Sequence, residues 1–528
     1  MAEASEEISG PEDARQKAVA EPARERKEFD RVLILIFALM AAYVALFATL
    51  GLLKYANFRS SSIDNAIFNQ VIWLMSRFKA PVSTIRGLNI FGDHMEPVLI
   101  LLVPLYWLKF NVPGLIVVQT VALGLGALPI YLLARDKLES RPVAVGVAAA
   151  YLVYPALQHL TLGDFHPEAL GLAFLLFAFL AIDRRRFGWF YFCCVGAALC
   201  KEDMILAVLV LGIVVYFLYD KRAGKIVAIS SLACFIAAIA FLIPHFAPAG
   251  YQYSGRLGQF GKTPSEALKN MFFHPLRSFN ILATRQNLSY VLDLLLPVAF
   301  LAVLAPAYLL PALPAFVINI ISNFAPQHTI YFQQYTAAII PFVFIATIFG
   351  LRKVRNWADG SFRQARVVGA VTLILLLCVL GTNVYYGPSP ISVGWRTILY
   401  RSDAHVDSIR KGISLIPKGA PTSAQVYMLA HLSEREKLYM FPQPFADYVD
   451  KDYFDAIGEE GRNGVFPGMK QGKAMPRVDY IVLDTRGEVF PLPPDQYEKA
   501  VKRIRESGKY ATIFDSRGVV VLKRADLR

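Results

Sequence analysis

Three titratable side chains fall within five positions at Asp164, His166 and Glu168, between two long apolar segments. A second group of the same composition precedes Pro97, and a third interrupts an apolar hairpin. The second group is Asp93, His94 and Glu96, and the third is Lys201, Glu202 and Asp203. A charge at membrane depth costs about 2.5 to 3.5 kcal/mol on insertion scales, so it usually faces a cavity or a partner. We interpret the three groups as walls of one site.

Asp64 follows three serines, just after the first apolar segment. A carboxylate in this place could act as a general base and take the proton of an attacking hydroxyl. The alternative is local, because serine caps and an acid in the first turn both favour the start of a helix. The start of a helix would also explain Pro167 and Glu168, because proline and an acid are both favoured in the first turn. It does not explain Asp164 and His166.

Lys201 could supply a fixed positive charge for a phosphate. The apolar segment before it, residues 187–200, spans roughly 21 Å as a helix, which is shorter than a bilayer core. We therefore expect the turn at Lys201 to lie below the membrane surface, in a recess lined by protein. The alternative is a turn whose opposite charges neutralise one another.

The acid and histidine groups could bind substrate hydroxyls or a divalent metal. Divalent metals take histidine nitrogen and carboxylate oxygen, but neither group has a stereotyped ligand spacing. We favour hydroxyl binding, and keep a metal as the lesser alternative, on His94, Glu96, Asp164 and His166. His328 opens a later apolar segment within a polar and aromatic strip, for which an interfacial aromatic belt is the alternative. The substrate-binding candidates are Lys201, Glu202, His166, Glu168, Asp93, His94, Glu96 and His328.

The composition places these groups in a polytopic helical membrane protein. The 528 residues are 55% hydrophobic and 18% charged, and the apolar residues occur in segments of helical length. The net charge of +13 comes mostly from short loops beside these segments, and no nucleic-acid-binding motif is present. All five cysteines lie in apolar segments, which is typical of buried small side chains rather than of a disulfide framework.

The sequence predicts a mainly α fold with about eleven membrane crossings. Residues 1–31 read as a disordered cytoplasmic tail, and residues 63–78 as an amphipathic helix on the membrane surface. Residues 98–110 are too short to cross and are predicted to be re-entrant or interfacial. The predicted crossings are residues 32–53, 114–134, 143–159, 169–182, 187–200, 204–219, 226–246, 288–304, 307–321, 330–351 and 367–386.

The basic loops predict the orientation. If residues 98–110 do not cross, all four basic loops are cytoplasmic, whereas a crossing there would place all four outside. These loops are Arg135–Lys137, Asp183–Arg186, Lys221–Arg222 and Arg352–Arg366. The N-terminus is then cytoplasmic, and Asp64, the three charged groups and His328 are all external. A long external loop, residues 247–285, is a candidate lid or acceptor site, with Tyr251, Tyr253, Arg256, Lys262, Arg277 and Arg285.

Residues 388–528 have the hydropathy of a soluble domain, and we predict a small external α/β domain there. Residues 422–429, 478–484, 511–515 and 519–523 are predicted strands, and residues 495–507 an amphipathic helix. No phosphate-binding glycine loop and no nucleophile elbow occurs in this region.

The order and spacing of five motifs resemble a bacterial and archaeal family of predicted membrane proteins named domain of unknown function 2079, over roughly residues 32–386. The motifs are Ile63–Gln70, Asp93–Pro97, Tyr154–Ala156, Asp164–Pro167 and Lys201–Asp203. That family is in turn similar to the GT-C superfamily, membrane glycosyltransferases that take a sugar from a polyprenyl-phosphate carrier. The resemblance implies catalytic roles for Asp64, as the acid of the first external loop, and for Asp164, as the acid after the third crossing. The chain departs from many GT-C enzymes in having Asn65, not a second acid, after Asp64.

The expected function is transfer of a sugar from a polyprenyl-phosphate donor to an envelope glycan, lipid or protein at the external face of a bacterial or archaeal cytoplasmic membrane. Its partners would be this donor, the acceptor and membrane lipid, without nucleic acid. A transporter or lipid flippase is the first alternative, but transporters usually show paired repeats with broken midplane helices, whereas these charges gather at one face. A membrane-anchored envelope assembly protein also stays open, since fold alone does not decide function.

Overall fold

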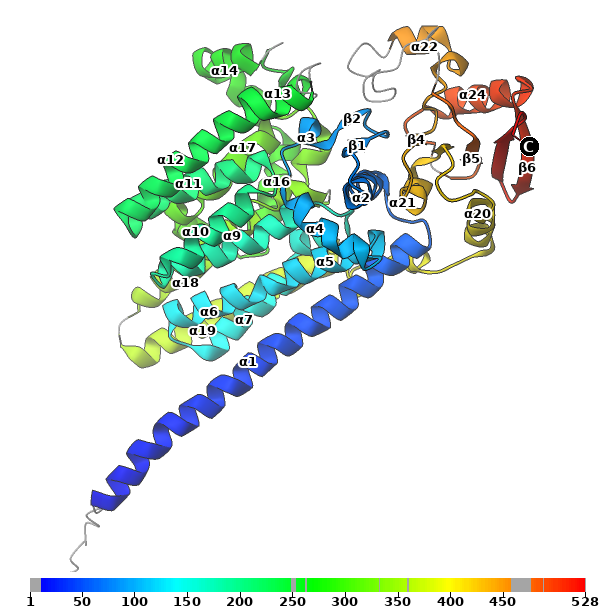
Figure 1. The fold of residues 1–528 in the computed structure, drawn as a ribbon. Helices are drawn as coiled ribbons and strands as arrows, with labels where there is room; N and C mark the ends of the chain where they lie inside the picture. Colours follow the sequence, from blue (N-terminus) through cyan, green and yellow to red (C-terminus); the bar gives the residue numbers. More distant parts are fainter. Residues whose placement is uncertain are drawn as a thin grey trace, which may run out of the picture.

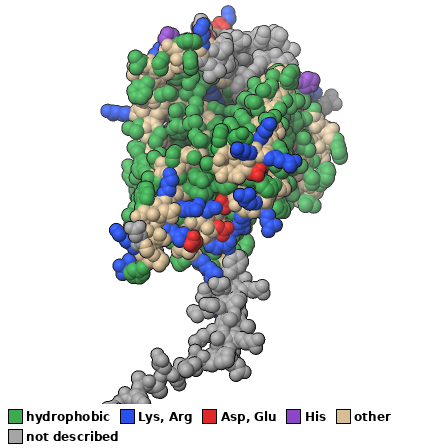
Figure 2. All heavy atoms as spheres, turned by 90° about the vertical axis from the view of Figure 1, so that its left-hand side faces the viewer, with side chains coloured by type: hydrophobic (Ala, Val, Ile, Leu, Met, Phe, Trp, Pro, Cys, Tyr) green, Lys and Arg blue, Asp and Glu red, His purple; other side chains and the backbone are tan. Residues whose placement is uncertain are grey.

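The computed structural model describes the backbone of residues 11–247, 253–261, 264–331, 333–358, 360–456, 476–487 and 489–527. It consists of a bundle of helices with a small sheet domain at one end (Figure 1). Figure 2 shows one side of the bundle, where hydrophobic side chains cover most of the surface and Lys and Arg gather over the lower half. An apolar surface of this extent is what a bundle in contact with lipid presents.

The first helix, α1, runs without a break from Pro11 to Ala56. Residues 11–31 are thus helical, and the prediction of a disordered tail is wrong for them. The reason is composition, because this segment is rich in Ala, Glu, Arg and Lys, which favour a helix, and it leads directly into the apolar span. Residues 1–10 of the predicted tail lie outside the described residues.

Four helical segments in the described part of the chain are long and apolar enough to cross a membrane. They are Arg31–Ala56, Val112–Leu138, Lys221–Phe246 and Ser361–Tyr386. A fifth candidate is the pair α7 (Arg141–Val153) and α8 (Pro155–Leu162), bent by 45° at the proline. Proline causes such a bend because it lacks an N–H and its ring clashes with the preceding turn.

The other predicted crossings are shorter helices or are broken. The helices between Glu168 and Leu218 have 16, 12 and 17 residues, and they are α9 (Glu168–Asp183), α10 (Phe187–Ala198) and α11 (Glu202–Leu218). The predicted crossing 288–304 is not one helix, because α16 (Arg285–Leu295) ends just before Pro297. Prolines likewise divide the following segment into 3-10 turns and α17 (Leu313–Ile321), and α18 (Ile340–Asn356) starts at Ile340 rather than Ile330. The total of eleven crossings stays a prediction.

The external loop after α1 holds α2 (Ile63–Ser76), a two-stranded ribbon, α3 (Ile90–Asp93) and α4 (Val98–Trp107). The ribbon pairs β1 (Val82–Ser83) with β2 (Leu88–Asn89) in antiparallel register. Helix α2 confirms the predicted helix, and it is covered by α4 and by the C-terminal domain, on which it packs. Its place at the membrane surface stays a prediction. Its polar residues Asn65, Asn69 and Gln70 are buried. At about 15 Å, α4 is too short to cross a bilayer.

The C-terminal domain has a five-stranded sheet in the order β4-β3-β5-β7-β6. Strands β3 (Thr422–Ala424) and β5 (Tyr480–Asp484) match predicted strands, as do β6 (Tyr510–Ser516) and β7 (Val519–Arg524), while β4 (Leu438–Met440) was not predicted. The β4–β3–β5 part is parallel, and β7 and β6 complete the sheet in antiparallel fashion. The predicted helix is α24 (Pro494–Glu506), and α20 (Ala404–Ser414) and α21 (Leu429–Leu432) face the bundle.

Direct hydrogen bonds fasten this domain to the external loop. Asn69 Nδ2 donates to Ser433 Oγ at 2.8 Å, and Gln70 Nε2 donates to the carbonyl of Arg435 at 3.1 Å. The Arg410 guanidinium donates to the carbonyl at the end of α1 at 2.9 Å. One apolar core is also shared, because side chains of α2 and α4 join those of the sheet domain in a single cluster. Helix α2 is therefore held between the bundle and the C-terminal domain.

Candidate active site

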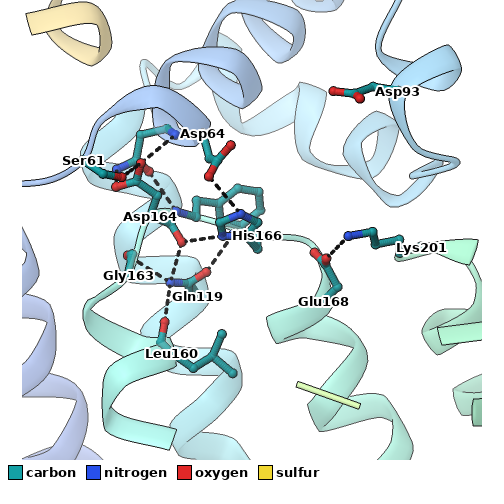
Figure 3. Close-up of polar contacts among 12 residues, drawn as sticks. Ser61, Asp64, Asp93, Gln119, Leu160, Gly163, Asp164, His166, Glu168 and Lys201 are labelled. Carbon is teal, nitrogen blue, oxygen red and sulfur yellow. Dashed lines mark hydrogen bonds and ion pairs between the residues drawn. The ribbon is translucent and has the colours of Figure 1, made fainter. Parts of the chain in front are cut away.

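Asp64 lies in the first turn of α2, beside the loop that joins α8 to α9 (Figure 3). Ser62, just before the helix, adopts the left-handed conformation with φ of 64°, which turns the chain into α2. The Asp64 side chain is 37% exposed, whereas that of His166 beside it is 4% exposed. Asp64 is therefore the accessible acid of an otherwise buried group.

Asp164 is buried, and both of its carboxylate oxygens accept hydrogen bonds. Ser61 Oγ donates to it at 2.7 Å and Asn65 Nδ2 at 2.9 Å. Asn65 Oδ1 in turn accepts from the backbone N–H of Phe165 at 2.9 Å. Asp164 and Asn65 thus clip the α8–α9 loop to the start of α2. The sequence made Asp164 a catalytic candidate, but these contacts give it the geometry of a group that positions Asp64.

His166 connects this clip to Asp64. Its Nε2 lies 3.3 Å from Asp64 Oδ2, and its Nδ1 lies 2.9 Å from the carbonyl oxygen of Asp164. Its backbone N–H donates to Gln119 Oε1 at 2.9 Å, and Gln119 Nε2 donates to the carbonyl of Leu160 at 3.1 Å. The buried Gln119 of α5 (Val112–Leu125) therefore fixes the loop that carries His166.

The charges of the pair stabilise each other. Burial by itself would raise the pKa of the Asp64 carboxyl, but the hydrogen bond and positive charge of His166 outweigh it, so this pKa lies below its ordinary value. Burial likewise opposes the His166 imidazolium, yet its bond to Asp64 and the charge of that carboxylate raise the pKa of His166. Burial and the nearby Asp64 raise the pKa of Asp164. Both shifts favour the ionised form of the pair, a carboxylate beside an imidazolium.

Asp93 forms a second buried group with Arg86 and Tyr253. Arg86 donates to both carboxylate oxygens of Asp93, from Nε at 2.8 Å and from Nη2 at 3.0 Å. The Tyr253 hydroxyl donates to Asp93 Oδ1 at 2.7 Å and accepts from Arg86 Nη2 at 3.0 Å. Although burial acts in the opposite direction, the charge of Arg86 holds the pKa of Asp93 well below its usual range. The negative charge of Asp93 is therefore already compensated.

The ring of His94 stacks on the ring of Tyr253, with 4.8 Å between the two centroids. Its Nδ1 is 2.6 Å from Glu202 Oε1, and the backbone N–H of Met95 donates to Glu202 Oε2 at 3.0 Å. Glu202, at the start of α11, is thus occupied on both oxygens.

Lys201 is buried and paired with Glu168, with 2.6 Å between Nζ and Oε1 (Figure 3). The sequence suggested Glu202 or Asp203 as its neutralising neighbours, so this partner was not foreseen. The second oxygen of Glu168 and one oxygen of the equally buried Glu96 have no hydrogen-bond partner among the described residues. The paired ammonium is poorly placed to be a free anchor for phosphate, while the two glutamate oxygens remain as acceptors.

Arg256 provides a cation, which the sequence named as a residue of the long external loop and as one of the alternatives to Lys201 for binding phosphate. Its guanidinium lies over the rings of Tyr253, at 4.4 Å, and Phe324, at 4.5 Å, and it donates to Gln327 Oε1 at 3.4 Å. No carboxylate among the described residues pairs with it. The Tyr335 ring lies near the same guanidinium, with 6.0 Å between Arg256 Cζ and the ring centroid. Arg256 is therefore an unneutralised cation next to the acid groups.

His328 is not brought into this group. Its ring nitrogens face Asn287 Oδ1 at 2.5 Å and the carbonyl oxygen of Ser322 at 2.7 Å, so it holds the segment before α18. Of the other residues in the predicted lid, Tyr251 and Lys262 lie outside the described residues.

The residues considered for a metal do not converge. Asp164 and His166 belong to the clip on α2, whereas His94 bonds to Glu202. Among the residues that the structure describes, no three His, Cys, Asp or Glu side chains are arranged to hold a metal ion.

One residue of the site, Gln119, was not identified from the sequence, because it lies inside an apolar segment. Tyr253 was named only as part of the candidate lid, and Tyr335 belongs to the polar and aromatic strip that includes His328. A buried glutamine in a predicted crossing was the one available signal, since a polar side chain there needs a partner.

The family model described as "Predicted membrane protein (DUF2079)" matches residues 54–521 of the chain. A sequence search of the curated proteins finds no match.

Among solved structures, the chain is similar to ArnT from Cupriavidus metallidurans bound to undecaprenyl phosphate, with 13% identity, 93% of this chain and 97% of that chain covered, and a TM-score of 0.45. The apo state of the same protein has 12% identity and a TM-score of 0.47, and the match covers 91% of this chain and 98% of that chain. The apo oligosaccharyltransferase of Archaeoglobus fulgidus has 13% identity and a TM-score of 0.44, and the match covers 93% of this chain and 74% of that chain.

Proposed function

The chain belongs to the DUF2079 family of predicted membrane proteins, and we propose that it is a membrane glycosyltransferase that moves a sugar from a polyprenyl-phosphate donor to an acceptor at the external face. The observation that carries this proposal is the state of Asp64. It is a solvent-accessible carboxylate, held at one oxygen by a buried histidine, whereas the other paired acids of the group are buried.

The contrast among the acids supports Asp64 as the base. Asp164 accepts from Ser61 and Asn65, and the remaining paired acids are bound by cationic or histidine side chains. These acids are Asp93 with Arg86, Glu168 with Lys201, and Glu202 with His94. A general base must reach the proton it removes, and accessibility favours Asp64 for this role.

In the proposed step, the acceptor hydroxyl oxygen attacks the anomeric carbon and forms the new glycosidic bond. The bond from that carbon to the phosphate oxygen breaks, and its electron pair leaves with polyprenyl phosphate. The hydroxyl proton passes to Asp64, so that the carboxylate becomes a carboxylic acid and charge is conserved. The low pKa of Asp64 suits a late proton transfer, when the attacking hydroxyl has become acidic through bonding to carbon.

Arg256 is proposed to hold the departing phosphate. A guanidinium binds phosphate oxygens through two parallel N–H groups, and that of Arg256 is braced by aromatic rings without a carboxylate partner in the described residues. This assignment replaces Lys201, whose charge is used by Glu168. The free buried oxygens of Glu96 and Glu168 are proposed to accept hydrogen bonds from sugar hydroxyls.

The orientation expected from the basic loops places this site outside the cytoplasm, where a lipid-linked donor could keep its tail in the bilayer. The C-terminal domain covers α2 and would limit access from the aqueous side.

The test is transfer of labelled sugar from a polyprenyl-phosphate donor in proteoliposomes, with the parent chain and with Asp64→Asn. A transporter, flippase or assembly protein would form no new glycosidic bond with either chain.

A further inference from the structure

A second candidate binding site lies where the end of α1 meets the C-terminal domain. A cavity of about 420 Å³ is enclosed there by residues 57–60 of the external loop and by residues of the sheet domain, among them His405, Asp484 and Arg486. This volume is within the range of small-molecule sites. None of the residues that line it belongs to the group around Asp64.

The floor of the cavity is organised by Asp484, at the end of β5. This carboxylate is fully buried, accepts from the Tyr427 hydroxyl, and accepts from the backbone N–H of Arg486 at 2.8 Å. His405 Nε2 approaches it at 2.7 Å. Asp484 is therefore saturated by the protein and serves to orient the groups around it.

His405 is fixed at the wall of the cavity by two contacts. Its Nε2 faces the Asp484 carboxylate at 2.7 Å, and its Nδ1 faces the carbonyl oxygen of Arg517 at 3.0 Å.

Two arginines complete the wall. Arg59 pairs with Asp403 through Nη2 at 3.1 Å, but its Nε is buried and has no partner among the described residues. Arg486 is exposed and forms no ion pair within the described part of the chain. A buried N–H without an acceptor costs about 1 to 3 kcal/mol, so an acceptor from a ligand would relieve it. The lining thus holds two guanidinium groups, Arg59 and Arg486, against one carboxylate, Asp484, while the Asp403 that pairs with Arg59 lies outside it.

We propose that this cavity binds a phosphate group, with Arg59 and Arg486 as its guanidinium ligands. Guanidinium groups recognise phosphate through paired N–H donors, and the excess of cations favours an anion over a neutral sugar. Residues 57–60 of the lining follow directly on the end of the α1 span, so a bilayer around this span would have its surface near the cavity. The phosphate could therefore belong to a soluble sugar phosphate or to a lipid headgroup.

Calorimetric titration of the purified full chain with glucose 1-phosphate tests the soluble source, with glucose as the uncharged control. The parent should bind glucose 1-phosphate, and Arg486→Gln and Arg59→Gln should each weaken binding about tenfold or more. Arg486→Lys should recover part of the affinity. The matched control Arg401→Gln removes an exposed arginine of the same domain and should retain binding at this cavity.

The lipid arm uses nanodiscs of phosphatidylcholine with and without phosphatidylglycerol, and measures phosphatidylglycerol retained by the chain with mass spectrometry. Retention that Arg486→Gln abolishes assigns a headgroup. The proposal is overturned if the parent retains neither probe, if glucose binds as well as its phosphate, or if Arg486→Gln equals the parent in both arms.

Discussion

The Asp64 carboxylate and the Nε2 atom of His166 lie 3.3 Å apart, and the other ring nitrogen of His166 faces the carbonyl oxygen of Asp164 at 2.9 Å. Both neighbours are acceptors, so the doubly protonated ring satisfies them both. The pair joins the external helix α2 to the loop between α8 and α9, and it leaves the second oxygen of Asp64 available for a substrate hydroxyl.

The pair predicts a bell-shaped pH profile. The pKa of Asp64 lies below its ordinary value of 3.8 and that of His166 above 6.5, so the ionised pair should persist between these limits. We expect kcat/KM for sugar transfer to fall as pH drops through the Asp64 pKa and to fall again as pH rises through the His166 pKa. The stability from the raised His166 pKa is fully present below 6.5 and is lost on the same alkaline limb.

His166→Gln keeps a hydrogen-bond donor but removes the titratable ring, so the alkaline limb should disappear and the rate at pH 6 should drop about 10- to 100-fold. The midpoint temperature of thermal unfolding should fall above pH 6.5 in the parent, and this fall should be absent in the variant. A profile identical to that of the parent would show that His166 does not act on Asp64.

Arg256 is predicted to anchor the donor phosphate. Arg256→Gln should weaken binding of polyprenyl phosphate about 10- to 100-fold, because a charge-assisted hydrogen bond to phosphate is lost. The salt dependence of binding should fall with it. Fluorescence titration with a labelled polyprenyl phosphate measures both, and the exposed Arg285→Gln is the matched control. Equal affinity in Arg256→Gln and Arg285→Gln would remove Arg256 from the site.

Lys201 is predicted to act on stability. Lys201→Met leaves the Glu168 carboxylate buried without its partner, which should cost about 3 to 5 kcal/mol of unfolding free energy. Adding Glu168→Gln should recover much of this loss, because the unpaired charge is gone. Thermal unfolding in detergent provides the comparison. If Lys201→Met unfolds like the parent but loses donor affinity, the lysine is a phosphate ligand after all.

The topology is testable without knowledge of the substrate. We predict that the loops at Arg135 and Arg184 are cytoplasmic, and that Asp164 and the domain from Pro388 onward are external. In a background without cysteine, Ser140→Cys should resist a membrane-impermeant thiol reagent in intact cells, and Lys418→Cys should react. The reverse pattern of labelling would invert the orientation.

Apolar periodicity and local propensity predicted much of the fold. The helix of residues 63–76 and four of the five strands of the C-terminal sheet were found in this way. Strand β4 was missed because its three residues follow directly on the charged residues 434–437, whereas the equally short β3 begins a longer, mostly apolar run. The burial of α2 was missed because amphipathicity shows which residues are polar but not what covers them, and here Asn69 and Gln70 meet the sheet domain.

Residue types placed the charged groups together but could not assign partners within them. Asp64 and His166 were both candidates, yet only the packing of α2 on the α8–α9 loop makes them neighbours. The pairing of Lys201 with Glu168 was missed, and Glu202 or Asp203 was the expected neutralising neighbour, since Glu168 lies at the start of another helix and no local pattern connects the two. The role of Arg256 depends on three aromatic rings that come from separate segments.

The most direct test of the account is the transfer of labelled sugar from polyprenyl-phosphate donors, extracted from the native membrane, by proteoliposomes of the parent chain and of Asp64→Asn. Asparagine has nearly the volume of aspartate and cannot take the proton, so we predict a loss of about 100- to 10,000-fold with unchanged thermal unfolding and unchanged binding of polyprenyl phosphate. Transfer by Asp64→Asn at the rate of the parent would contradict the assignment of Asp64 as the base.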